Sequence, residues 1–438
     1  MKTRARGALH RVVIVGGGAG GLELATRLGD KLGRPGRAHI TLVDRSRTHL
    51  WKPLLHEVAA GSMDIHAHQL DYLAQARWHR FTFVLGALAG LQRASRHVEV
   101  AAVTDDEGVE ILPARRIAYD TLVIAIGSES NDFGTPGVRE NAFTIDNAWQ
   151  AHLFHRRLVN TCFRANFAAD GRVLNIAIVG AGATGVELAA ELHNTLRVLT
   201  AYGLENFDPE RQIRIHLVEA GPRLLPGLPE YIAQETLKTL EALGVDVMVD
   251  ERVVEVLPDR LRTATGREVT AEFTVWAAGI RVSDVLKDID GLETNRLNQL
   301  VVLPTLQVTR DPDIFALGDC AAAPWTADRA VPPRAQAAHQ QASHLLKTVM
   351  RRLAGKPPRE FHYRDFGSLV SLGHYQTVGT LMGFATRGTV RVEGLLAKLF
   401  YLSLYRLHIW ALYGFWRMAL DTLARTIRSQ TDPKVKLH

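Results

Sequence analysis

The chain has 438 residues, of which 47% are hydrophobic and 22% are charged, with 36 Gly and 17 Pro. This balance is that of a globular protein, and it excludes a disordered, collagen-like or coiled-coil chain. The length predicts two to four domains of roughly 100 to 200 residues each. Only two cysteines are present and neither belongs to a Cys-x-x-Cys pair, so dithiol chemistry, a disulfide framework and a metal site are not expected. A reducing cytosolic compartment fits best.

The formal net charge is +6, and residues 391–438 carry eight Lys or Arg against three acids, which is +5. This concentration of positive charge at the end of the chain favours an anionic partner, either membrane lipid or nucleic acid. The apolar runs fall short of the roughly 18 to 20 residues of a membrane-spanning helix. The basic first ten residues lack an apolar segment with a cleavage site, so we interpret them as a solvated tail and not as a signal peptide.

The first motif begins with an apolar strand over 11–15 that runs into a glycine-rich turn. The turn has the spacing G-x-G-x-x-G, and a helix follows over 22–32. A second apolar strand ends in an acid, and a third runs into a closing glycine. The residues that define this copy are Gly16, Gly18, Gly21, Asp44 and Gly127.

The same order of strand, turn, helix, acid-ended strand and glycine-ended strand recurs between 175 and 279. The residues that define this second copy are Gly180, Gly182, Gly185, Glu219 and Gly279. From the first glycine to the closing glycine, the two copies span 111 and 99 residues. A lone G-x-G-x-x-G is a weak signal, but the full context appears twice. The chain is therefore predicted to contain a duplicated dinucleotide-binding fold.

Each residue type in the pattern has a physical role. The first glycine allows a tight turn, the second lets the backbone approach a pyrophosphate, and the third lets the helix pack on the strand. The N-terminus of the helix offers unpaired N–H groups to the phosphates. The acid accepts hydrogen bonds from a ribose hydroxyl. Asp44 and Glu219 stand 28 and 39 residues after the first glycine of their turns, where about 20 is usual, so we expect insertions over 31–38 and 194–212.

Glu219 also bears on the choice of nicotinamide cofactor. An acid at this position repels a 2′-phosphate, which favours NADH over NADPH, although Arg223 lies close enough to weaken the argument. Further along the chain, a short strand delivers the turn Gly318-Asp319, which can place an acid on the ribityl chain of a flavin. Taken alone, this is an ordinary Gly-Asp turn.

Together these motifs resemble the flavoprotein family with two dinucleotide-binding domains, over about residues 10–345. Within that family the chain is similar to the bacterial type II NADH dehydrogenases. The discriminating stretch is Arg334-Ala335-Gln336-Ala337-Ala338-His339-Gln340-Gln341, which matches the family's quinone-site motif A-Q-x-A-x-Q. The stretch Gly367-Ser-Leu-Val-Ser-Leu and the ending Lys434-Val-Lys-Leu-His438 look like the enterobacterial branch.

The resemblance implies an α/β fold with two Rossmann-like domains. The first is expected to bind FAD, and the second, inserted in the first, to bind NADH. A C-terminal membrane-anchoring domain with amphipathic helices is implied as well. We expect the FAD domain over 1–145 and 291–345, the NADH domain over 146–290, and the C-terminal domain over 346–438.

The resemblance also assigns binding residues. For FAD it implies Gly16, Gly18, Gly21, Asp44, Lys52, Pro53, Leu54, Ala125, Gly127, Gly318, Asp319, Ala335 and Gln336. For NADH it implies Gly180, Gly182, Gly185, Glu187, Glu219, Ala278 and Gly279. His374 is a candidate for the basic residue that some members of the family carry near the flavin.

Three residues are candidates for the chemistry. Glu187 occupies the family's acidic position near the nicotinamide, where it would deliver protons. The competing interpretation is an acid in the first turn of a helix, favoured by the macrodipole by roughly 0.3 to 1 kcal/mol. Gln336 and Gln340 are four residues apart, so on a helix they share a face and could present two uncharged amides to a quinone carbonyl or to the flavin edge. Seen alone, such a pair is more often a solvated surface.

Residues 394–420 are rich in Leu, Phe, Tyr and Trp. At about 100° per residue, four basic residues fall within an arc of about 120° and leave the apolar residues on the remainder: Lys398, Arg406, Arg417 and Arg428. This pattern predicts an interfacial amphipathic helix that binds an anionic bilayer. A core helix or a dimer interface is the alternative. Nucleic acid fits less well, because the aromatic residues are packed among leucines.

The resemblance thus implies an NADH:quinone oxidoreductase. A hydride would pass from NADH to N5 of FAD, and a membrane quinone, ubiquinone or menaquinone, would be reduced to quinol without proton pumping. The expected location is the cytoplasmic face of the bacterial inner membrane, as a peripheral protein, with a homodimer left open. Two alternatives stand beside this prediction: a soluble FAD-dependent NADH reductase with a protein acceptor, and a flavin-bound NADH sensor or scaffold at the membrane.

Overall fold

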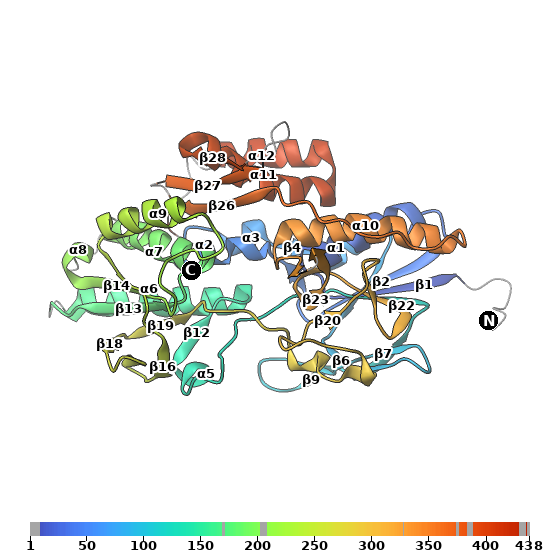
Figure 1. Cartoon of the computed structure of the whole chain (residues 1–438), viewed down its shortest axis with the longest axis horizontal. Coiled ribbons are helices and arrows are strands. Elements are labelled where there is room, and N and C mark those ends of the chain that lie inside the picture. Colours follow the sequence, from blue (N-terminus) through green and yellow to red (C-terminus); the bar gives the residue numbers. More distant parts are fainter. Residues whose placement is uncertain are drawn as a thin grey trace.

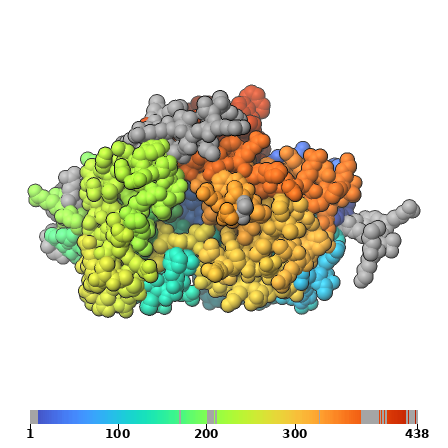
Figure 2. Space-filling model, viewed as in Figure 1, coloured from blue at the N-terminus to red at the C-terminus, as the bar shows by residue number. Residues whose placement is uncertain are grey.

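Two parallel sheets form the body of the molecule. They lie side by side in Figure 1, and the C-terminal strands and helices lie across their top. The computed structural model describes residues 9–168, 171–201, 208–326, 328–373, 376–382, 389–428 and 435. In the space-filling view of Figure 2, the second unit, in yellow-green, stands beside the orange segment that returns to the first unit.

The first sheet is built from continuous apolar runs such as VVIV at 12–15, all of them buried. Such runs suit parallel strands, because both faces of a parallel sheet are usually covered. Five of its strands are parallel, and β21 is antiparallel to β22. In sheet order the strands are β21 (Gln307–Val308), β22 (Asp311–Ala316), β11 (Thr121–Ile124), β1 (His10–Val15), β2 (Ala38–Asp44) and β5 (Thr82–Leu85).

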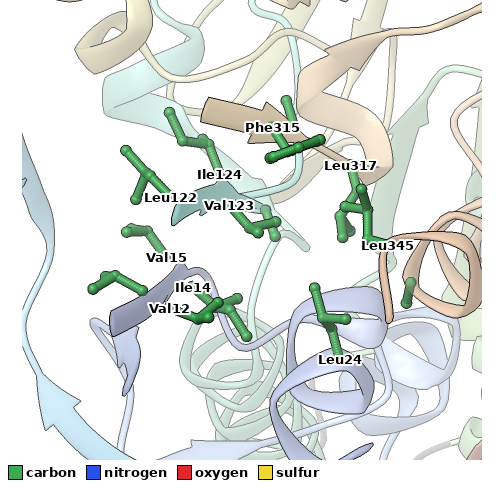
Figure 3. Packing of buried hydrophobic residues seen from close by; sticks show 14 of the residues in the cluster. Val12, Ile14, Val15, Leu24, Leu122, Val123, Ile124, Phe315, Leu317 and Leu345 are labelled. Carbon is green, nitrogen blue, oxygen red and sulfur yellow. The ribbon is translucent and has the colours of Figure 1, made fainter. Parts of the chain in front are cut away.

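Helices α1 (Ala19–Leu28) and α10 (Ala335–Leu353) pack against each other on this sheet. Figure 3 places Leu24 of α1 and Leu345 of α10 in the same buried cluster as Ile14 of β1 and Phe315 of β22. Helix α4 (Tyr72–His79) packs beside α1. A three-stranded antiparallel sheet of β10 (Arg115–Ala118), β7 (His97–Val100) and β6 (Leu88–Gln92) contributes to the cluster as well.

The first helix is shorter than the sequence predicts. A helix was expected over 22–32, but α1 ends at Leu28, and a π-helical turn over Gly29–Gly33 and a loop lead to β2. This turn and loop account for most of the extra distance between the glycine-rich turn and Asp44.

The second sheet has five parallel strands, and all of them lie between β11 and β22 along the chain. This is the connectivity of one α/β unit inserted into another. In sheet order the strands are β12 (Ala142–Thr144), β19 (Phe273–Trp276), β13 (Leu174–Val179), β14 (Ile213–Val218) and β15 (Val245–Met248). Because β12 pairs with β19, it belongs to this sheet although it precedes the predicted boundary at 145/146. The predicted boundaries stay predictions.

Long helices accompany the second sheet. They are α6 (Ala148–Ala168), α7 (Ala183–Ala201) and α9 (Glu230–Ala242), with the short α8 (Pro209–Gln212) just ahead of β14. The long α7 and the chain that follows it account for the insertion expected over 194–212. A three-stranded antiparallel sheet completes the unit: β16 (Val253–Val256), β17 (Arg260–Thr263) and β18 (Glu268–Thr270).

A segment of the first unit packs into the core of the second. Helix α2 (Leu55–Ala60) follows β3 (Thr48–His49) and packs against α6 and α7, with Ala59 and Ala60 fully buried. Its residues share one hydrophobic cluster with β13 and β14. The short α3 (Ile65–His68) and β4 (Leu70–Asp71) then lead back to α4. The two units are therefore joined by a common apolar core.

The C-terminal part consists of a three-stranded sheet and two helices. The strands are β26 (Gly367–Leu372), β27 (Gln376–Met382) and β28 (Thr389–Glu393), and the helices are α11 (Gly394–Tyr413) and α12 (Phe415–Arg428). The amphipathic pattern predicted across 394–420 is interrupted, because Gly414 has a φ of +81° and separates α11 from α12. The four basic residues therefore do not form one arc: Lys398 and Arg406 lie on α11, and Arg417 and Arg428 lie on α12.

Candidate functional site

The two glycine-rich turns share one geometry. In both, the first glycine has a positive φ, +105° at Gly16 and +102° at Gly180. A methyl group on the third glycine of the first turn, Gly21, would lie 1.8 Å from the carbonyl oxygen of Gly16. At the middle glycines, Gly18 and Gly182, an added Cβ would meet no atom within 4 Å. The first and third glycines therefore serve packing, and the middle glycine leaves the backbone open to a ligand.

The two predicted ribose acids hold these turns in the same way. Asp44 accepts a hydrogen bond from the backbone N–H of Gly17 at 2.6 Å, and its other oxygen accepts from Ser46 at 2.7 Å. Glu219 accepts from the N–H of Ala181, the corresponding residue of the second turn, at 2.7 Å. Desolvation raises the pKa of Asp44, and the hydrogen bonds from Gly17 and Ser46 oppose the rise. Each carboxylate keeps further lone pairs for a ribose hydroxyl.

Polar residues that are distant along the chain meet beyond the carboxyl ends of β11 and β22. The ammonium group of Lys52 donates to the carbonyl of Ser128 at 2.7 Å, and the Ser128 hydroxyl donates to the carboxylate of Asp319 at 2.7 Å. The backbone N–H of Gly318 donates to the side-chain oxygen of Gln341 at 2.7 Å. Sequence reasoning missed Ser128 and Gln341, although Ser128 directly follows the closing glycine and Gln341 directly follows the quinone motif.

The other residues predicted for FAD lie near the same edge of the sheet. Ala125 directly follows β11 and donates its N–H to the carbonyl of Val15 at 2.7 Å. Gly127 has a φ of +74° and no atom within 4 Å of an added Cβ. Pro53 and Leu54 lie in a single 3-10 turn, and Ala335 is the first residue of α10.

Gln336 and Gln340 lie on one face of α10, as predicted, and both amides contact the chain that leads to β26. Gln336 donates to the carbonyl of Gly367 at 2.9 Å and accepts from the N–H of Phe366 at 3.2 Å. Gln340 donates to the carbonyl of Arg364 at 2.8 Å and accepts from its N–H at 3.0 Å. The pair thus anchors the link between α10 and the C-terminal sheet, and its role toward quinone stays a prediction.

The residues predicted for the nicotinamide follow β19, where the segment 131–133 packs against them. The carbonyl of Ala278 accepts from the N–H of Asn131 at 3.3 Å, and the indole of Trp276 donates to the carbonyl of Asn131 at 2.8 Å. An added Cβ on Gly279 would lie 2.3 Å from the ring of Phe133. Phe133 is exposed, and sequence reasoning did not single it out.

Glu187 lies where three parts of the molecule meet. It is buried on α7, one of its oxygens accepts from the backbone N–H of Ser371 on β26 at 3.0 Å, and the other lies 3.5 Å from Nδ1 of His56 on α2. Burial lowers the pKa of His56 to about 4, so this imidazole is neutral near pH 7. The contact is therefore a polar contact of a carboxylate with a neutral ring and not an ion pair.

Glu57, the residue next to His56 on α2, is a second acid in this region. Glu57 keeps part of its surface in contact with solvent, but desolvation of its carboxyl, together with the charge of Glu191, raises its pKa to about 8. Glu57 is therefore largely protonated at neutral pH. His374, named from the resemblance as a basic residue near the flavin, lies outside the described residues.

The chain is similar to known proteins over most of its length. Residues 10–342 match the sequence family described as pyridine nucleotide-disulphide oxidoreductase. The chain is 45% identical over 445 residues to the type II NADH:quinone oxidoreductase of Haemophilus influenzae, an alignment that covers 98% of this chain and 100% of that protein. The chain belongs to the type II NADH:quinone oxidoreductases. It is also 30% identical to the Staphylococcus aureus (strain NCTC 8325 / PS 47) member over 85% of this chain and 90% of that protein.

Solved structures show the same fold for this type II oxidoreductase. An NDH2 structure from Plasmodium falciparum in complex with NADH superposes with a TM-score of 0.80 at 17% identity and covers 98% of this chain and 100% of that chain. The sulfide:quinone oxidoreductase of Aquifex aeolicus superposes with a TM-score of 0.71 at 18% identity, over 92% of this chain and 91% of that chain.

Neither cysteine of this type II oxidoreductase is placed for thiol chemistry. Cys162 on α6 and Cys320 after β22 are both buried and unpaired with each other, and burial raises the pKa of each thiol to about 12. A thiolate, which is the reactive form, is therefore not available near neutral pH. Within the described residues, no group of three potential metal ligands comes together.

The C-terminal helices expose an apolar surface. On α12 the exposed residues Trp416, Leu420, Leu423 and Ile427 recur at the spacing of one helix face. On α11 the exposed residues are Phe400, Leu404, Leu407 and Trp410, while Ala397, His408, Ile409 and Leu412 are buried. We call the exposed residues of both helices the apolar surface. Among the helices that the structure describes, none is long and apolar enough to span a membrane.

Proposed function

We propose that this protein binds FAD at the first glycine-rich turn and NADH at the second, and that it transfers two electrons from NADH to a membrane quinone. The observation that carries the proposal is the paired geometry of the turns, in which an open middle glycine and an acid bonded to the loop occur twice in one chain. In the net reaction, NADH, one proton and quinone yield NAD⁺ and quinol. Membership of the type II family supports this reaction.

The residues of the first unit fit FAD. The open backbone at Gly18 and the N-terminus of α1 suit a pyrophosphate, and Asp44 suits the adenosine ribose. A cavity of about 510 Å³ lies at the carboxyl end of β5, where it is lined by Leu85 and Arg115 among others. Leu85 pairs with Asp44 across the sheet, so the cavity suits the adenine end of the cofactor. Bound FAD would supply the two-electron chemistry, because it accepts a hydride from NADH and passes electrons to quinone.

The protein's own residues orient the reacting groups. The chain of hydrogen bonds from Lys52 through Ser128 to Asp319 holds a carboxylate that we assign to the ribityl chain of FAD. Glu219 is assigned to accept hydrogen bonds from the hydroxyl groups of the adenosine ribose of NADH. Its charge would repel the 2′-phosphate that NADPH carries on this ribose. Ala278 and Gly279 position the nicotinamide.

Glu187 is the acid we assign to proton exchange during turnover. Its place between α7, α2 and β26 supports this role, because it is where both units and the C-terminal sheet meet. Gln336 and Gln340 are assigned to the quinone end, where they hold the 364–367 segment beside the first turn of α10. Uncharged amides suit an apolar substrate, since they add no charge that would have to be desolvated.

The apolar surface of α11 and α12 is assigned to the membrane interface. Four large apolar residues on one face of α12, with Arg417 beside them, form the pattern of a helix that lies in the plane of a bilayer. The net positive charge of the last 48 residues would add attraction to anionic lipid. This placement would bring the quinone to the protein from the lipid side.

The function is tested by steady-state NADH oxidation. The FAD-loaded full-length protein is assayed with a water-soluble ubiquinone analogue, with NADH or NADPH as the donor. We expect quinone-dependent turnover with NADH and a kcat/KM for NADPH lower by at least tenfold. Glu219→Gln should narrow the difference between the two donors, because it removes the repulsion. Rapid flavin reduction without quinone turnover would instead indicate a protein acceptor or a sensor.

A further inference from the structure

A buried chain of hydrogen bonds connects α11 to the FAD turn. Nε2 of His408 on α11 lies 2.9 Å from Nε2 of His49, and Nδ1 of His49 lies 2.9 Å from the carbonyl oxygen of Gly17. The phenol of Tyr72 donates to the same carbonyl oxygen at 2.8 Å. Both imidazoles are only 4% exposed, and the ring of His408 packs on Trp51 with centroids 4.1 Å apart.

The acceptor at the end of this chain determines the direction of every donor. A carbonyl oxygen only accepts, so Nδ1 of His49 carries the hydrogen. The neutral His49 ring then has a bare Nε2, which accepts a hydrogen bond from the Nε2–H of His408. The hydrogen bonds therefore run one way, from His408 through His49 to Gly17, and removal of His408 would leave a buried acceptor unpaired.

Gly17 stands between the tight turn at Gly16 and the open position at Gly18. Its N–H is bonded to Asp44 and its carbonyl to His49 and Tyr72, so its peptide groups are held on both sides. We propose that His408 is a positioning residue for FAD, which acts through His49 to hold the Gly17 carbonyl in the orientation that leaves the turn open to the pyrophosphate. This inference rests on the proposed FAD site, and it makes cofactor retention depend on a helix whose outer face is assigned to lipid.

The link responds to acid, because a second proton on His49 would occupy the Nε2 lone pair that accepts from His408 at 2.9 Å, and a second proton on His408 would place a charge in a buried site. Burial lowers the pKa of His49 to about 4, and burial with the neighbouring His49 and His339 lowers the pKa of His408 well below 6.5. With α11 undocked, both rings would regain the ordinary value near 6.5. A lowered pKa means that the link is complete above pH 6.5 and is lost as the pH falls toward 4.

Other ionisable groups face the link from the neighbouring elements. His339 on α10 lies 2.5 Å from the carboxylate of Glu23 on α1, which also accepts from Arg27 at 2.7 Å. Asp44 at the end of β2 accepts a hydrogen bond from the N–H of Gly17. Burial, together with the charge of Asp44, raises the pKa of Tyr72 on α4. Within the link the test therefore changes only positions 49 and 408, so that these neighbouring groups remain the same in every variant.

The test measures the dissociation constant for FAD on the full-length apoprotein, by quenching of flavin fluorescence at pH 7.5 and pH 5.5. His408→Leu removes the donor and keeps an apolar side chain, whereas His408→Gln restores an N–H donor that does not titrate. We expect His408→Leu to raise the dissociation constant at least tenfold at pH 7.5, and His408→Gln to stay within about threefold of the parent, since a buried hydrogen bond is lost only in the first. His216→Gln, on β14 of the second unit, is the matched control and should match the parent.

The pH profile separates positioning from general stability. The dissociation constant of the parent should rise several-fold between pH 7.5 and pH 5.5, and that of the double variant His49→Gln with His408→Gln should rise clearly less. An unchanged dissociation constant in folded His408→Leu, or an equal pH dependence in the double variant, would overturn the inference. If His408→Leu does not fold, the inference is tested by the pH dependence of the dissociation constant in His408→Gln and in the double variant. A parent that binds no FAD would contradict the proposed function itself, which is a separate outcome.

Discussion

At the scale of single residues, the glycines of the second turn separate binding from folding. Gly182→Ala adds a methyl group where no protein atom lies within 4 Å, so the fold should persist. The methyl group would instead keep the pyrophosphate of NADH away from the backbone of the turn. We expect the dissociation constant for NADH to rise at least tenfold with the melting temperature unchanged. Gly185→Ala would place its methyl group 2.0 Å from the carbonyl oxygen of Gly180, so the melting temperature should fall. Calorimetry and NADH titration of both variants measure this contrast, and equal effects in the two would refute it.

Glu57 supplies a second prediction at this scale. Its pKa is raised from 4.5 to about 8, so its contribution to stability is complete below pH 4.5 and is lost as the pH rises through 8. Glu57→Gln has no such loss, because the amide stays neutral. At about 1.4 kcal/mol per pKa unit, the free energy of unfolding of the parent should fall relative to the variant by roughly 4 kcal/mol between pH 5 and pH 8.5. Urea melts at the two pH values give the difference, with Glu241→Gln on α9 as an exposed control, and parallel behaviour of Glu57→Gln and the parent would contradict it.

At the scale of elements, the proposed membrane interface predicts that the apolar face of α12 determines how strongly the protein binds lipid vesicles. Leu420→Glu with Leu423→Glu places two charges on that face, where each leucine buried in lipid contributes roughly 1.5–3 kcal/mol. We expect at least a tenfold loss of binding to lipid vesicles in a sedimentation assay, with the melting temperature retained. Val254→Glu, an exposed apolar residue on β16 at the opposite end of the molecule in Figure 1, is the control and should bind like the parent. Retained vesicle binding by the α12 variant would argue for another use of this face.

At the scale of the whole molecule, charge and apolar burial should make separable contributions to membrane association. Nearly all of the net charge of +6 belongs to residues 391–438. Binding to vesicles with anionic lipid should therefore weaken between 50 and 500 mM salt, since the Debye length shortens from roughly 14 to 4 Å. Binding to neutral vesicles should be weaker but insensitive to salt, because apolar burial is not screened. A co-sedimentation series in salt tests this, and equal salt dependence on both lipids would count against the electrostatic part.

The two glycine-rich turns and the acids that bond to them could be predicted from the amino-acid sequence. These features are local, because the glycines at 16 and 180 adopt a positive φ and each acid lies at the end of the next strand. The spacing of the acids differed from the usual one, but the structure shows that a π-helical turn and a long α7 take up the difference. The apolar character of the C-terminal helices was also readable from composition.

Contacts between residues far apart in the sequence could not be predicted and follow from the packing of the elements. Ser128 bonds to Asp319, Gln341 to Gly318 and His408 to His49, and no local pattern encodes these contacts. The arc of four basic residues failed as a prediction, because the periodicity of the sequence does not reveal that Gly414 ends α11 and that α12 begins after it. The physical reason is the same in each case. Local backbone preferences act within a few residues, whereas burial and hydrogen bonding act between whichever residues the packed sheets and helices bring within about 3 Å.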